Sequence, residues 1–360
     1  MRHYTIAAAL CSVSLCSLVM GATPGVIELP LHAASCTPGP ERGITVGILN
    51  DIHAVADLDK TLAFYKDVFG ISGAPRAFPN PGVPLLTNAP GVSLRLAVMK
   101  LPNAPHGFEL TDFTGVEKQA GRARLTDPGA AALDIYVSDL DQVVAAAQKG
   151  GYEIVTTSGR PVQGKWPSGK FGSKPFHTII LRDPDGYFVR ATQKPDAPTA
   201  AEGNAQGVAM DFTAESLETT RKFYGELLGF NFCETSWVNA AGGFDQLLGG
   251  LAKNAKYRMM NGKIPGTTAA IQFTEYKGMP RSKFHLRVRD PGAPAMCLQV
   301  KDLDGVLKRM KDAGVPVVSK DEKIVQFSPT VRNIFVVDPN GINLELYEVT
   351  PAPAKPTASN

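Results

Sequence analysis

Four segments of the chain place apolar residues at the spacing of an amphipathic helix, each directly after a short motif that suits a helix start. Each motif begins with a side chain that can cap a helix and puts an acid in the first turn. After the first motif, Leu58, Leu62 and Tyr65 form one apolar stripe. The four motifs lie at nearly equal intervals: Asp57-Leu58-Asp59, Asp139-Leu140-Asp141, Ser216-Leu217-Glu218 and Asp302-Leu303-Asp304.

The segments around these helices alternate in polarity or are rich in β-branched residues, which is typical of strands. Two turns, Asp183-Pro-Asp-Gly186 and Asp338-Pro-Asn-Gly341, have hairpin chemistry. We therefore predict four repeats, units 1 to 4, each made of a strand, a helix and further antiparallel strands. The strands before the helices are predicted at 44–54, 131–137, 208–213 and 295–300, and those after them at 93–99, 107–113, 178–181, 187–192, 268–276, 333–337 and 342–349.

The units alternate in type along the chain. Phe64-Tyr65 of unit 1 matches Phe223-Tyr224 of unit 3, and Asp127-Pro-Gly-Ala130 of unit 2 matches Asp290-Pro-Gly-Ala293 of unit 4. This order indicates that a domain of two units was duplicated. We predict one domain at 44–194, a Pro/Ala/Gly linker at 195–205, a second domain at 206–350 and a disordered tail at 351–360.

The N-terminal segment predicts export. A short basic start leads into residues 5–21, which contain no Asp, Glu, Lys or Arg and end in small residues. This pattern is typical of a cleaved signal peptide, here 1–22, followed by a leader at 23–43, and it predicts a secreted or periplasmic protein. A single membrane anchor is the alternative, although the run is short for one.

Composition excludes several classes without naming a function. The 360 residues carry 37 Lys and Arg against 34 Asp and Glu, a net charge of +3 that is too small to suggest nucleic-acid binding. Apolar residues at 44% and charged residues at 20% describe an ordinary globular protein. Beyond the signal, Cys36, Cys233 and Cys297 allow at most one internal disulfide, and we expect Cys233 and Cys297 to be buried apolar groups.

The repeats resemble a known superfamily. The motifs at 57–70 and 216–229, with Arg-Asp-Pro-Asp-Gly at 182–186 and the segment 338–346, are similar to those of the vicinal oxygen chelate superfamily. That superfamily includes glyoxalase I, bleomycin and fosfomycin resistance proteins and extradiol dioxygenases. The resemblance covers about residues 44–350 and implies an α+β fold, in which four βαβββ units pair into two tandem domains with cupped mixed sheets.

The resemblance also implies metal ligands on the first and last strand of each unit. The matching first-strand positions hold Asn50, Ala132, Ala209 and Ala295, and the last-strand positions hold Glu109, Arg190, Gln272 and Glu345. This set is incomplete for a tight site, because it lacks histidine and includes an arginine. We therefore predict no cofactor, while a divalent metal with an incomplete ligand set stays open. An arginine beside Glu109 favours a charge pair or an anionic ligand.

One histidine lies on a predicted first strand. His53 comes three positions after Asn50, so strand alternation places it on the opposite face, toward the helix. Only a β-bulge would turn it toward the cleft. We therefore expect His53 to be a core residue, with a ligand role as the alternative.

Strand alternation also lists the residues that face the clefts. Asp134 and Asp211 either meet a ligand or lie at a solvated mouth. In the first domain, Asn50, Glu109, Asp134 and Arg190 are expected to form a polar pocket with an acid–base carboxylate. The predicted catalytic residues are Glu109 and Glu345, and the predicted ligand-binding residues are Asn50, Asp134, Tyr136, Arg190, Asp211, Gln272 and Gln299.

Three functions remain open on this basis. The first is an exported protein that binds a small organic molecule in a cleft whose metal site is degenerate, in the manner of bleomycin resistance proteins. The second is a metal-dependent lyase, isomerase or dioxygenase working through Glu109 or Glu345. The third is an interaction platform without a ligand. We expect a small molecule as partner, no nucleic acid, no transmembrane span, and a monomer or homodimer.

Overall fold

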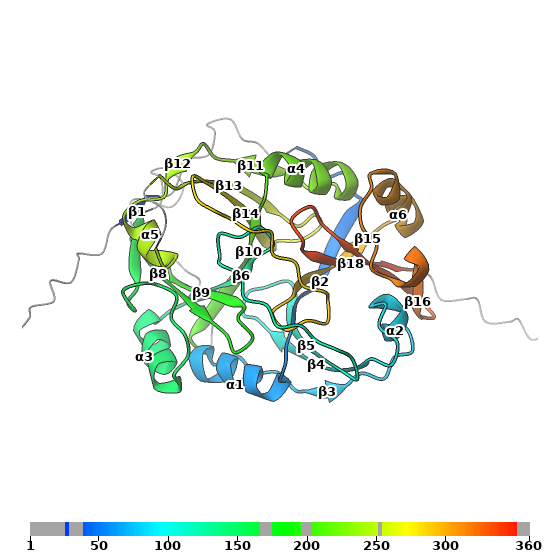
Figure 1. The fold of residues 1–360 in the computed structure, drawn as a ribbon, viewed down its shortest axis with the longest axis horizontal. Coiled ribbons are helices and arrows are strands. Elements are labelled where there is room, and N and C mark those ends of the chain that lie inside the picture. Colours follow the sequence, from blue (N-terminus) through cyan, green and yellow to red (C-terminus); the bar gives the residue numbers. More distant parts are fainter. Residues whose placement is uncertain (1–25, 29–38, 166–174, 196–202, 251–253, 351–360) are drawn as a thin grey trace, which may run out of the picture.

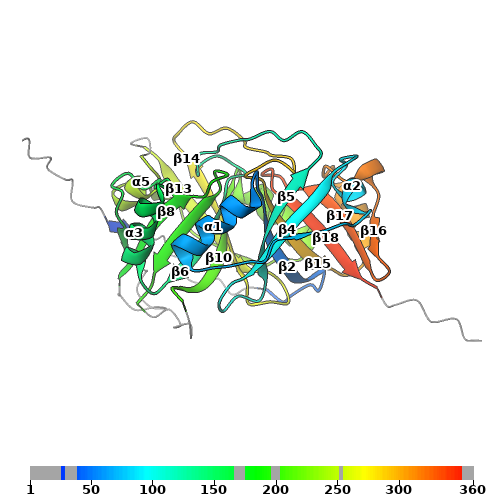
Figure 2. The ribbon, with the colours of Figure 1, turned by 90° about the horizontal axis from the view of Figure 1, so that it is seen from below.

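The computed structural model describes residues 26–28, 39–165, 175–195, 203–250 and 254–350. Two curled mixed sheets form the body of the molecule, and the helices lie around its rim (Figures 1 and 2). The predicted α+β architecture is confirmed. The predicted signal peptide at 1–22, most of the leader and linker, and the tail at 351–360 lie outside the described residues.

Sheet I has eight strands and combines units 1 and 4. Its central strands, β2 and β15, are the first strands of those two units. The order of the sheet is β16 (Val325–Ser328), β17 (Val331–Val337), β18 (Asn343–Val349), β15 (Pro294–Val300), β2 (Thr45–Ala54), β5 (Gly107–Thr114), β4 (Ser93–Lys100) and β3 (Arg76–Ala77).

Sheet II has ten strands and combines units 2 and 3. Its central strands, β6 and β10, are again the first strands of their units. The order is β1 (Val26–Glu28), β7 (Val162–Lys165), β8 (Pro175–Arg182), β9 (Phe188–Gln193), β6 (Ala131–Val137), β10 (Ala205–Ala214), β14 (Ala270–Lys277), β13 (Lys256–Lys263) and β11 (Phe232–Glu234), with β12 (Val238–Asn239) paired to β13.

The four predicted helices begin at the four motifs. In each case the predicted capping side chain accepts a hydrogen bond from the first turn; Asp57, for example, accepts from the backbone nitrogens of Asp59 and Lys60. The helices are α1 (Leu58–Phe69), α3 (Leu140–Gly150), α4 (Leu217–Lys222), which continues as the π-helix η1 (Phe223–Leu227), and α6 (Leu303–Asp312); the shorter ones are α2 (Val83–Leu86), α5 (Gly243–Leu247) and the 3-10 turn η2 (Lys320–Glu322).

The pairing of the units differs from our prediction. We expected unit 1 to share a sheet with unit 2, and unit 3 with unit 4. Instead β2 pairs antiparallel with β15, where Asn50 lies opposite Cys297, and β6 pairs antiparallel with β10, where Asp134 lies opposite Ala209. A sequence repeat identifies the units, but it does not say which units pair. The first strand of each unit has an unpaired edge, and the four edges are similar, so each could pair with any other. Each half of the chain therefore contributes one unit to each sheet.

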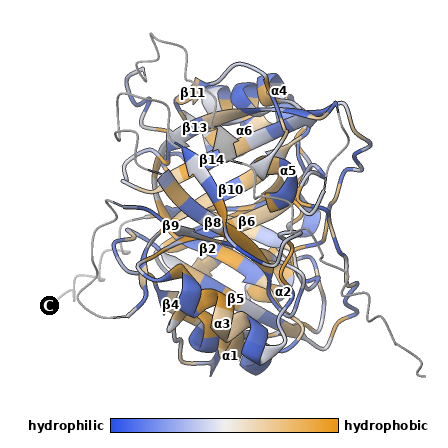
Figure 3. Ribbon diagram, turned by 90° about the vertical axis from the view of Figure 1, so that its left-hand side faces the viewer, coloured by the Kyte–Doolittle hydropathy of each residue, from blue (hydrophilic) through white to orange (hydrophobic). Residues whose placement is uncertain are grey.

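The largest hydrophobic core joins the helix side of both sheets. It includes Leu58, Phe64 and Tyr65 of α1 together with Leu140 and Val143 of α3. Apolar and polar residues are mixed along the strands, because only one face of each strand packs on this core (Figure 3). In the described ranges, no helix combines the length and the apolar character that crossing a membrane would require.

Candidate functional site

A row of polar side chains crosses sheet I on the face opposite the helices. Its members come from neighbouring strands: β5, β2, β15, β18 and β17. Asn50 Nδ2 donates to Glu109 Oε2 over 2.6 Å, and the Asn333 amide donates to Glu345. We call this set the carboxyl row; it consists of Asn50, Glu109, Cys297, Asn333 and Glu345.

The two carboxyl groups of this row are shifted toward their protonated forms. Burial and, to a smaller extent, the nearby Glu345 raise the pKa of Glu109 to about 7, against the lowering effects of the hydrogen bond from Asn50 and of the charge of Arg76. Burial also raises the pKa of Glu345, against the lowering effect of Asn333 and Cys297. Among the described residues, neither carboxylate forms an ion pair with a cation. The row is therefore an acid pair without an ion-paired cation among the described residues, and the charge of Arg76 has the smallest of the effects on the pKa of Glu109.

Cys297 lies between the two glutamates along the row. Its thiol is buried and free, and burial together with Glu345 and Glu109 raises its pKa well above the usual value. A thiol in this state is a poor nucleophile and a poor metal ligand. The expectation of a buried apolar group is met at Cys297, whereas Cys233 is disulfide-bonded.

An apolar cluster borders the carboxyl row. Ile52 and Ala295 extend the same strand faces, and Phe335 lies on β17 next to the strand that carries Glu345. Residues of α2, β16 and the segment before β15 complete the cluster, which comprises Ile52, Leu86, Val288, Ala295, Cys297, Val325 and Phe335. The site thus offers hydrogen-bonding groups beside an apolar surface.

Sheet II carries the equivalent row, but an arginine neutralises it. Arg190 donates to Asp134 through Nη2 and to Asp211 through Nη1, both over 2.9 Å. The side chains are only 20%, 7% and 11% exposed. These two ion pairs raise the pKa of Arg190 above its usual value despite burial. We call Asp134, Arg190, Asp211 and Gln272 the arginine row.

Other polar groups complete the arginine row. Thr192 donates to Asp134 over 2.7 Å, and Thr274 donates to Asp211 over 3.4 Å. Gln272 donates to Thr274 over 3.3 Å, and the ammonium of Lys194 lies 3.4 Å from the ring centre of Tyr136. Asp134 and Asp211 therefore pair with a partly buried cation, which was not among the environments that we predicted, and their contact with a ligand stays a prediction.

The structure divides the predicted pocket of the first domain between the two sheets. Asn50 and Glu109 belong to the carboxyl row with Glu345, whereas Asp134 and Arg190 belong to the arginine row. The predicted pairing of Arg190 with Glu109 is wrong, because unit 1 shares its sheet with unit 4. Gln272 and Glu345, expected in one domain, also lie on different sheets. Gln299 lies near the carboxyl row, where the Tyr347 hydroxyl donates to it over 3.4 Å.

Sequence reasoning missed Asn333, which orients Glu345. The signal was a polar residue on the same face of β17 as Phe335. His53 lies where strand alternation placed it, on the helix side of β2, with its ring centre 4.4 Å from that of Tyr187.

Comparison with known proteins identifies the family. A family model described as the Glyoxalase/Bleomycin resistance protein/Dioxygenase superfamily matches residues 52–190 and, a second time, residues 208–346. The chain belongs to this superfamily. Each matched segment contains two units, so the predicted resemblance and the tandem organisation are confirmed.

Solved structures of superfamily members show a similar fold. Glyoxalase I from Zea mays is 19% identical with a TM-score of 0.52, over 84% of this chain and 92% of that chain. A mutant of the same enzyme gives a TM-score of 0.53 over 84% and 93%. A putative dioxygenase from Bacillus subtilis subsp. subtilis str. 168 is 10% identical with a TM-score of 0.49, over 86% and 87%. The likeness to glyoxalase I shows the fold alone. No curated protein sequence matched the chain.

Superfamily members often use a divalent metal, and the two rows do not fit one. Asn50 and Asn333 point amide nitrogens, which are donors, at the two glutamates. In the other row a guanidinium already lies between the carboxylates. The described residues contain a different group of possible metal ligands, His53, Asp183 and Asp185, on the helix side of β2. One ligand atom of each residue lies within 4.8 Å of the other two.

Proposed function

We propose that this superfamily member is an exported protein that binds a small, uncharged organic molecule on the carboxyl row of sheet I. The observation that supports this proposal is the pair of half-buried acids, Glu109 and Glu345, which accept hydrogen bonds from Asn50 and Asn333 but form no ion pair among the described residues. A buried polar group without compensation costs free energy unless a partner satisfies it. The arginine row lacks this property, because its charges satisfy one another.

The environment of the row defines the class of ligand. A protonated Glu109 can donate a hydrogen bond to a carbonyl or hydroxyl oxygen, and Glu345 can accept one from a hydroxyl or amide. The neighbouring apolar cluster around Phe335 and Ile52 suits an apolar or aromatic portion of the ligand. Two carboxyl groups in this setting repel an anion. We therefore expect uncharged alcohols, ketones and amides to bind more tightly than carboxylates.

Binding is expected to depend on the protonation of Glu109. Affinity for an uncharged aromatic probe, benzamide or acetophenone, should fall above pH 7, because the ionised carboxylate no longer donates a hydrogen bond. Isothermal titration calorimetry from pH 5.5 to 9 measures this. Glu109→Gln keeps a donor, so its affinity should not vary over the same range, and Glu109→Leu should bind at least ~10-fold more weakly.

Glu348→Gln is the matched control for this experiment. Glu348 lies on the same strand as Glu345 but on the opposite face, where it pairs with Arg332. This variant should keep the affinity and the pH profile of the parent. Equal binding of benzoate and benzamide, or an unchanged affinity in Glu109→Leu, would contradict the proposed site.

A second function has one observation in its favour. A carboxyl group with a pKa of about 7 facing a second carboxyl group is suited to proton transfer, because one group can remove a proton while the other returns one. An isomerase or lyase acting on a carbonyl compound uses such a pair. Exchange of deuterium from solvent into a bound ketone, followed by NMR, separates this catalytic function from binding alone.

Export is the cellular part of the proposal. The uncharged run at 5–21 supports it, and so does the disulfide at Cys233, because stable disulfides are typical of oxidising compartments. After expression in a bacterium, the intact mass of protein from the periplasm or medium should lack the first 21 or 22 residues. A full-length mass, or recovery only with the membrane fraction, would favour the alternative of an uncleaved anchor.

A further inference from the structure

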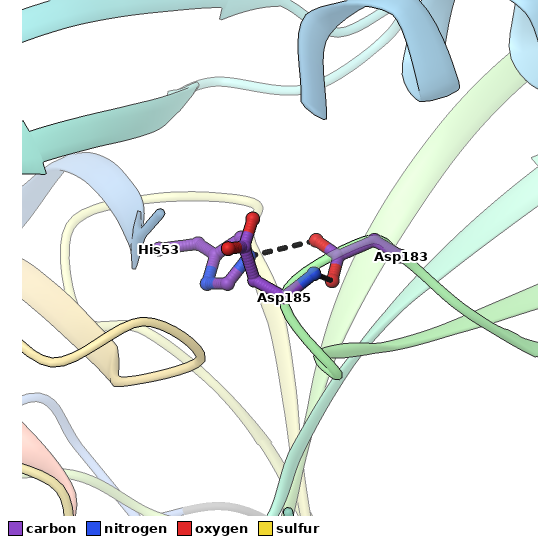
Figure 4. Close-up of side chains that lie close together, drawn as sticks. All are labelled: His53, Asp183 and Asp185. Carbon is purple, nitrogen blue, oxygen red and sulfur yellow. Dashed lines mark hydrogen bonds and ion pairs between the residues drawn. The ribbon is translucent and has the colours of Figure 1, made fainter. Parts of the chain in front are cut away.

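A cluster of charged side chains lies between the two sheets, on the helix side of β2. His53 of β2 meets Asp183 and Asp185 of the turn that joins β8 to β9 (Figure 4). His53 Nε2 lies 2.7 Å from Asp183 Oδ2, and one ligand atom of each residue lies within 4.8 Å of the other two. The side chains of His53 and Asp183 are 0% exposed, whereas Asp185 is half-buried. We call these three residues the His53 cluster.

Backbone and hydroxyl groups donate hydrogen bonds to both carboxylates of the cluster. Asp183 Oδ1 accepts from the backbone nitrogens of Asp185, over 3.0 Å, and Tyr187, over 2.9 Å. Asp185 accepts from the backbone nitrogen of Ala56 over 2.7 Å and from the Thr61 hydroxyl over 2.6 Å. Outer contacts of this kind orient the ligands of metal sites. The second oxygen of Asp183 faces the imidazole and also accepts a hydrogen bond from the Tyr65 hydroxyl over 3.5 Å.

A further buried carboxyl group lies close to the His53 cluster. Asp51 lies two residues before His53 on the same face of β2 and is fully buried. No side chain donates a hydrogen bond to either of its oxygens, and the Tyr187 hydroxyl and His53 Nδ1 also lack hydrogen-bond partners among the described residues. Three carboxyl groups, those of Asp51, Asp183 and Asp185, thus lie near one buried imidazole, and burying such groups costs free energy unless a partner satisfies them.

The duplicated half of the chain supplies an internal control. At the equivalent place between units 3 and 4, Asp338 accepts from the Tyr224 hydroxyl over 3.1 Å and from the Asn340 amide over 2.9 Å. Thr220 contacts Asn340 as Thr61 contacts Asp185. A hydrogen-bonded turn therefore fixes the helix to the neighbouring unit in both copies.

The second copy lacks counterparts of the charged residues Asp51, His53 and Asp185. The positions equivalent to Asp51, His53 and Tyr187 hold apolar residues, and Asn340 replaces the acid at Asp185. These apolar residues are Met210, Phe212 and Ile342, all of them buried. Since the turn works without the extra charges, packing and hydrogen bonding do not explain why one copy keeps an imidazole and two more carboxylates.

We propose that the His53 cluster binds one divalent transition-metal ion in a structural site between sheet I and sheet II, with the buried carboxyl group of Asp51 nearby. One imidazole nitrogen with carboxylate oxygens suits Zn²⁺ or Mn²⁺ better than Ca²⁺ or Mg²⁺, which take oxygen ligands. Ligand atoms at ~2.1 Å from a tetrahedral ion lie roughly 3.4 Å apart, so groups within 4.8 Å need only small side-chain movements to close on it.

The site differs in place and in role from the two rows described above. It lies on the opposite face of β2 from the carboxyl row, and its ligands come from both sheets. Burial leaves no room for a substrate beside the ion, so its effect is on stability. The half-buried Asp185 marks the side from which an ion enters.

Equilibrium dialysis of the full chain tests this proposal. The protein is first treated with EDTA and then dialysed against ZnCl₂, and bound zinc is measured by elemental analysis. We expect one Zn²⁺ per chain and a rise in Tm on loading. His53→Phe and Asp185→Asn reproduce the residues of the second copy, so both should lose the ion, and with it the rise in Tm.

Two further measurements keep the test decisive. Co²⁺ in place of Zn²⁺ should give a visible absorption spectrum typical of tetrahedral nitrogen and oxygen ligands, and Asp185→Asn should abolish it. Glu109→Gln alters the carboxyl row and should retain full zinc. Absence of bound zinc in the parent, equal zinc in Asp185→Asn, or loss of zinc in Glu109→Gln would each overturn the assignment. If His53→Phe fails to fold, Asp185→Asn still provides the test, because its amide oxygen can keep accepting a hydrogen bond from Ala56 or Thr61.

Discussion

Replacing Arg190 with Met is expected to lower the free energy of unfolding at pH 8 by about 3 kcal/mol, because Asp134 and Asp211 are left buried without a cation. The two carboxyl groups will then take up protons more readily in the folded state than in the unfolded state. In the variant, these protonated carboxyl groups stabilise the fold at low pH. That stability is lost as the pH rises through their raised folded-state pKa. Urea denaturation at pH 5 and pH 8 should show the larger deficit at pH 8.

Arg332→Met is the matched control for this variant. Arg332 also contacts two acids, Asp304 and Glu348, but Asp304 is 69% exposed. Its loss should cost about 1 kcal/mol or less, as expected for a surface pair. Adding Asp134→Asn and Asp211→Asn to Arg190→Met should recover much of the deficit and remove its pH dependence. Equal stability of the two arginine variants at both pH values would refute a structural role for the arginine row.

Glu109→Gln is expected to stabilise the protein at pH 8.5 by about 2 kcal/mol and to have little effect at pH 4.5. The folded-state pKa of Glu109 is about 7, above its ordinary value of 4.5, so the folded protein holds this proton more tightly than the unfolded chain does. Stability from this group is full below pH 4.5 and is lost as the pH rises to 7. The full shift corresponds to ~3 kcal/mol, and partial exposure of the side chain reduces it.

The measurement for Glu109 is a difference between two proteins. Guanidinium denaturation of the parent and of Glu109→Gln at five pH values between 4.5 and 8.5 gives the pH dependence of this one group, with other titrations cancelling. The difference should grow between pH 4.5 and 7 and stay constant above that range. A constant difference across the whole range would show that Glu109 titrates normally and would remove the main support for an acid pair.

Local features of the fold followed from the sequence, whereas long-range pairing did not. The helix starts at Leu58, Leu140, Leu217 and Leu303 depend on caps and periodicity within a few residues, and the structure has all four. Sheet pairing depends on contacts such as Asn50 with Cys297, which no local pattern encodes. The strand β13 was also missed, because Lys256–Lys263 alternates weakly and carries several polar residues.

The same distinction explains the outcome at the candidate site. Strand alternation correctly assigned faces, for example His53 toward the helices and Asn50 away from them. Strand alternation did not predict which side chains from other units lie nearby. Glu109 and Glu345 were placed in two different predicted domains, yet the charge of Glu345 raises the pKa of Glu109. The partner of Arg190 was mispredicted for the same reason, because Asp211 belongs to the other half of the chain.

The crossed arrangement of the four units has the geometry of a dimer whose subunits have been joined. A half-chain made only of units 1 and 2 would carry two first strands, β2 and β6, each with an open inner edge. Two such halves would satisfy these edges only by meeting one another, at a rate and affinity set by concentration. The covalent connection replaces that encounter by an intramolecular one with a high effective concentration, so both sheets persist at any dilution. It also allows the two halves to differ in sequence, and the two sheets indeed carry different rows, one with two acids and the other with an arginine between its acids.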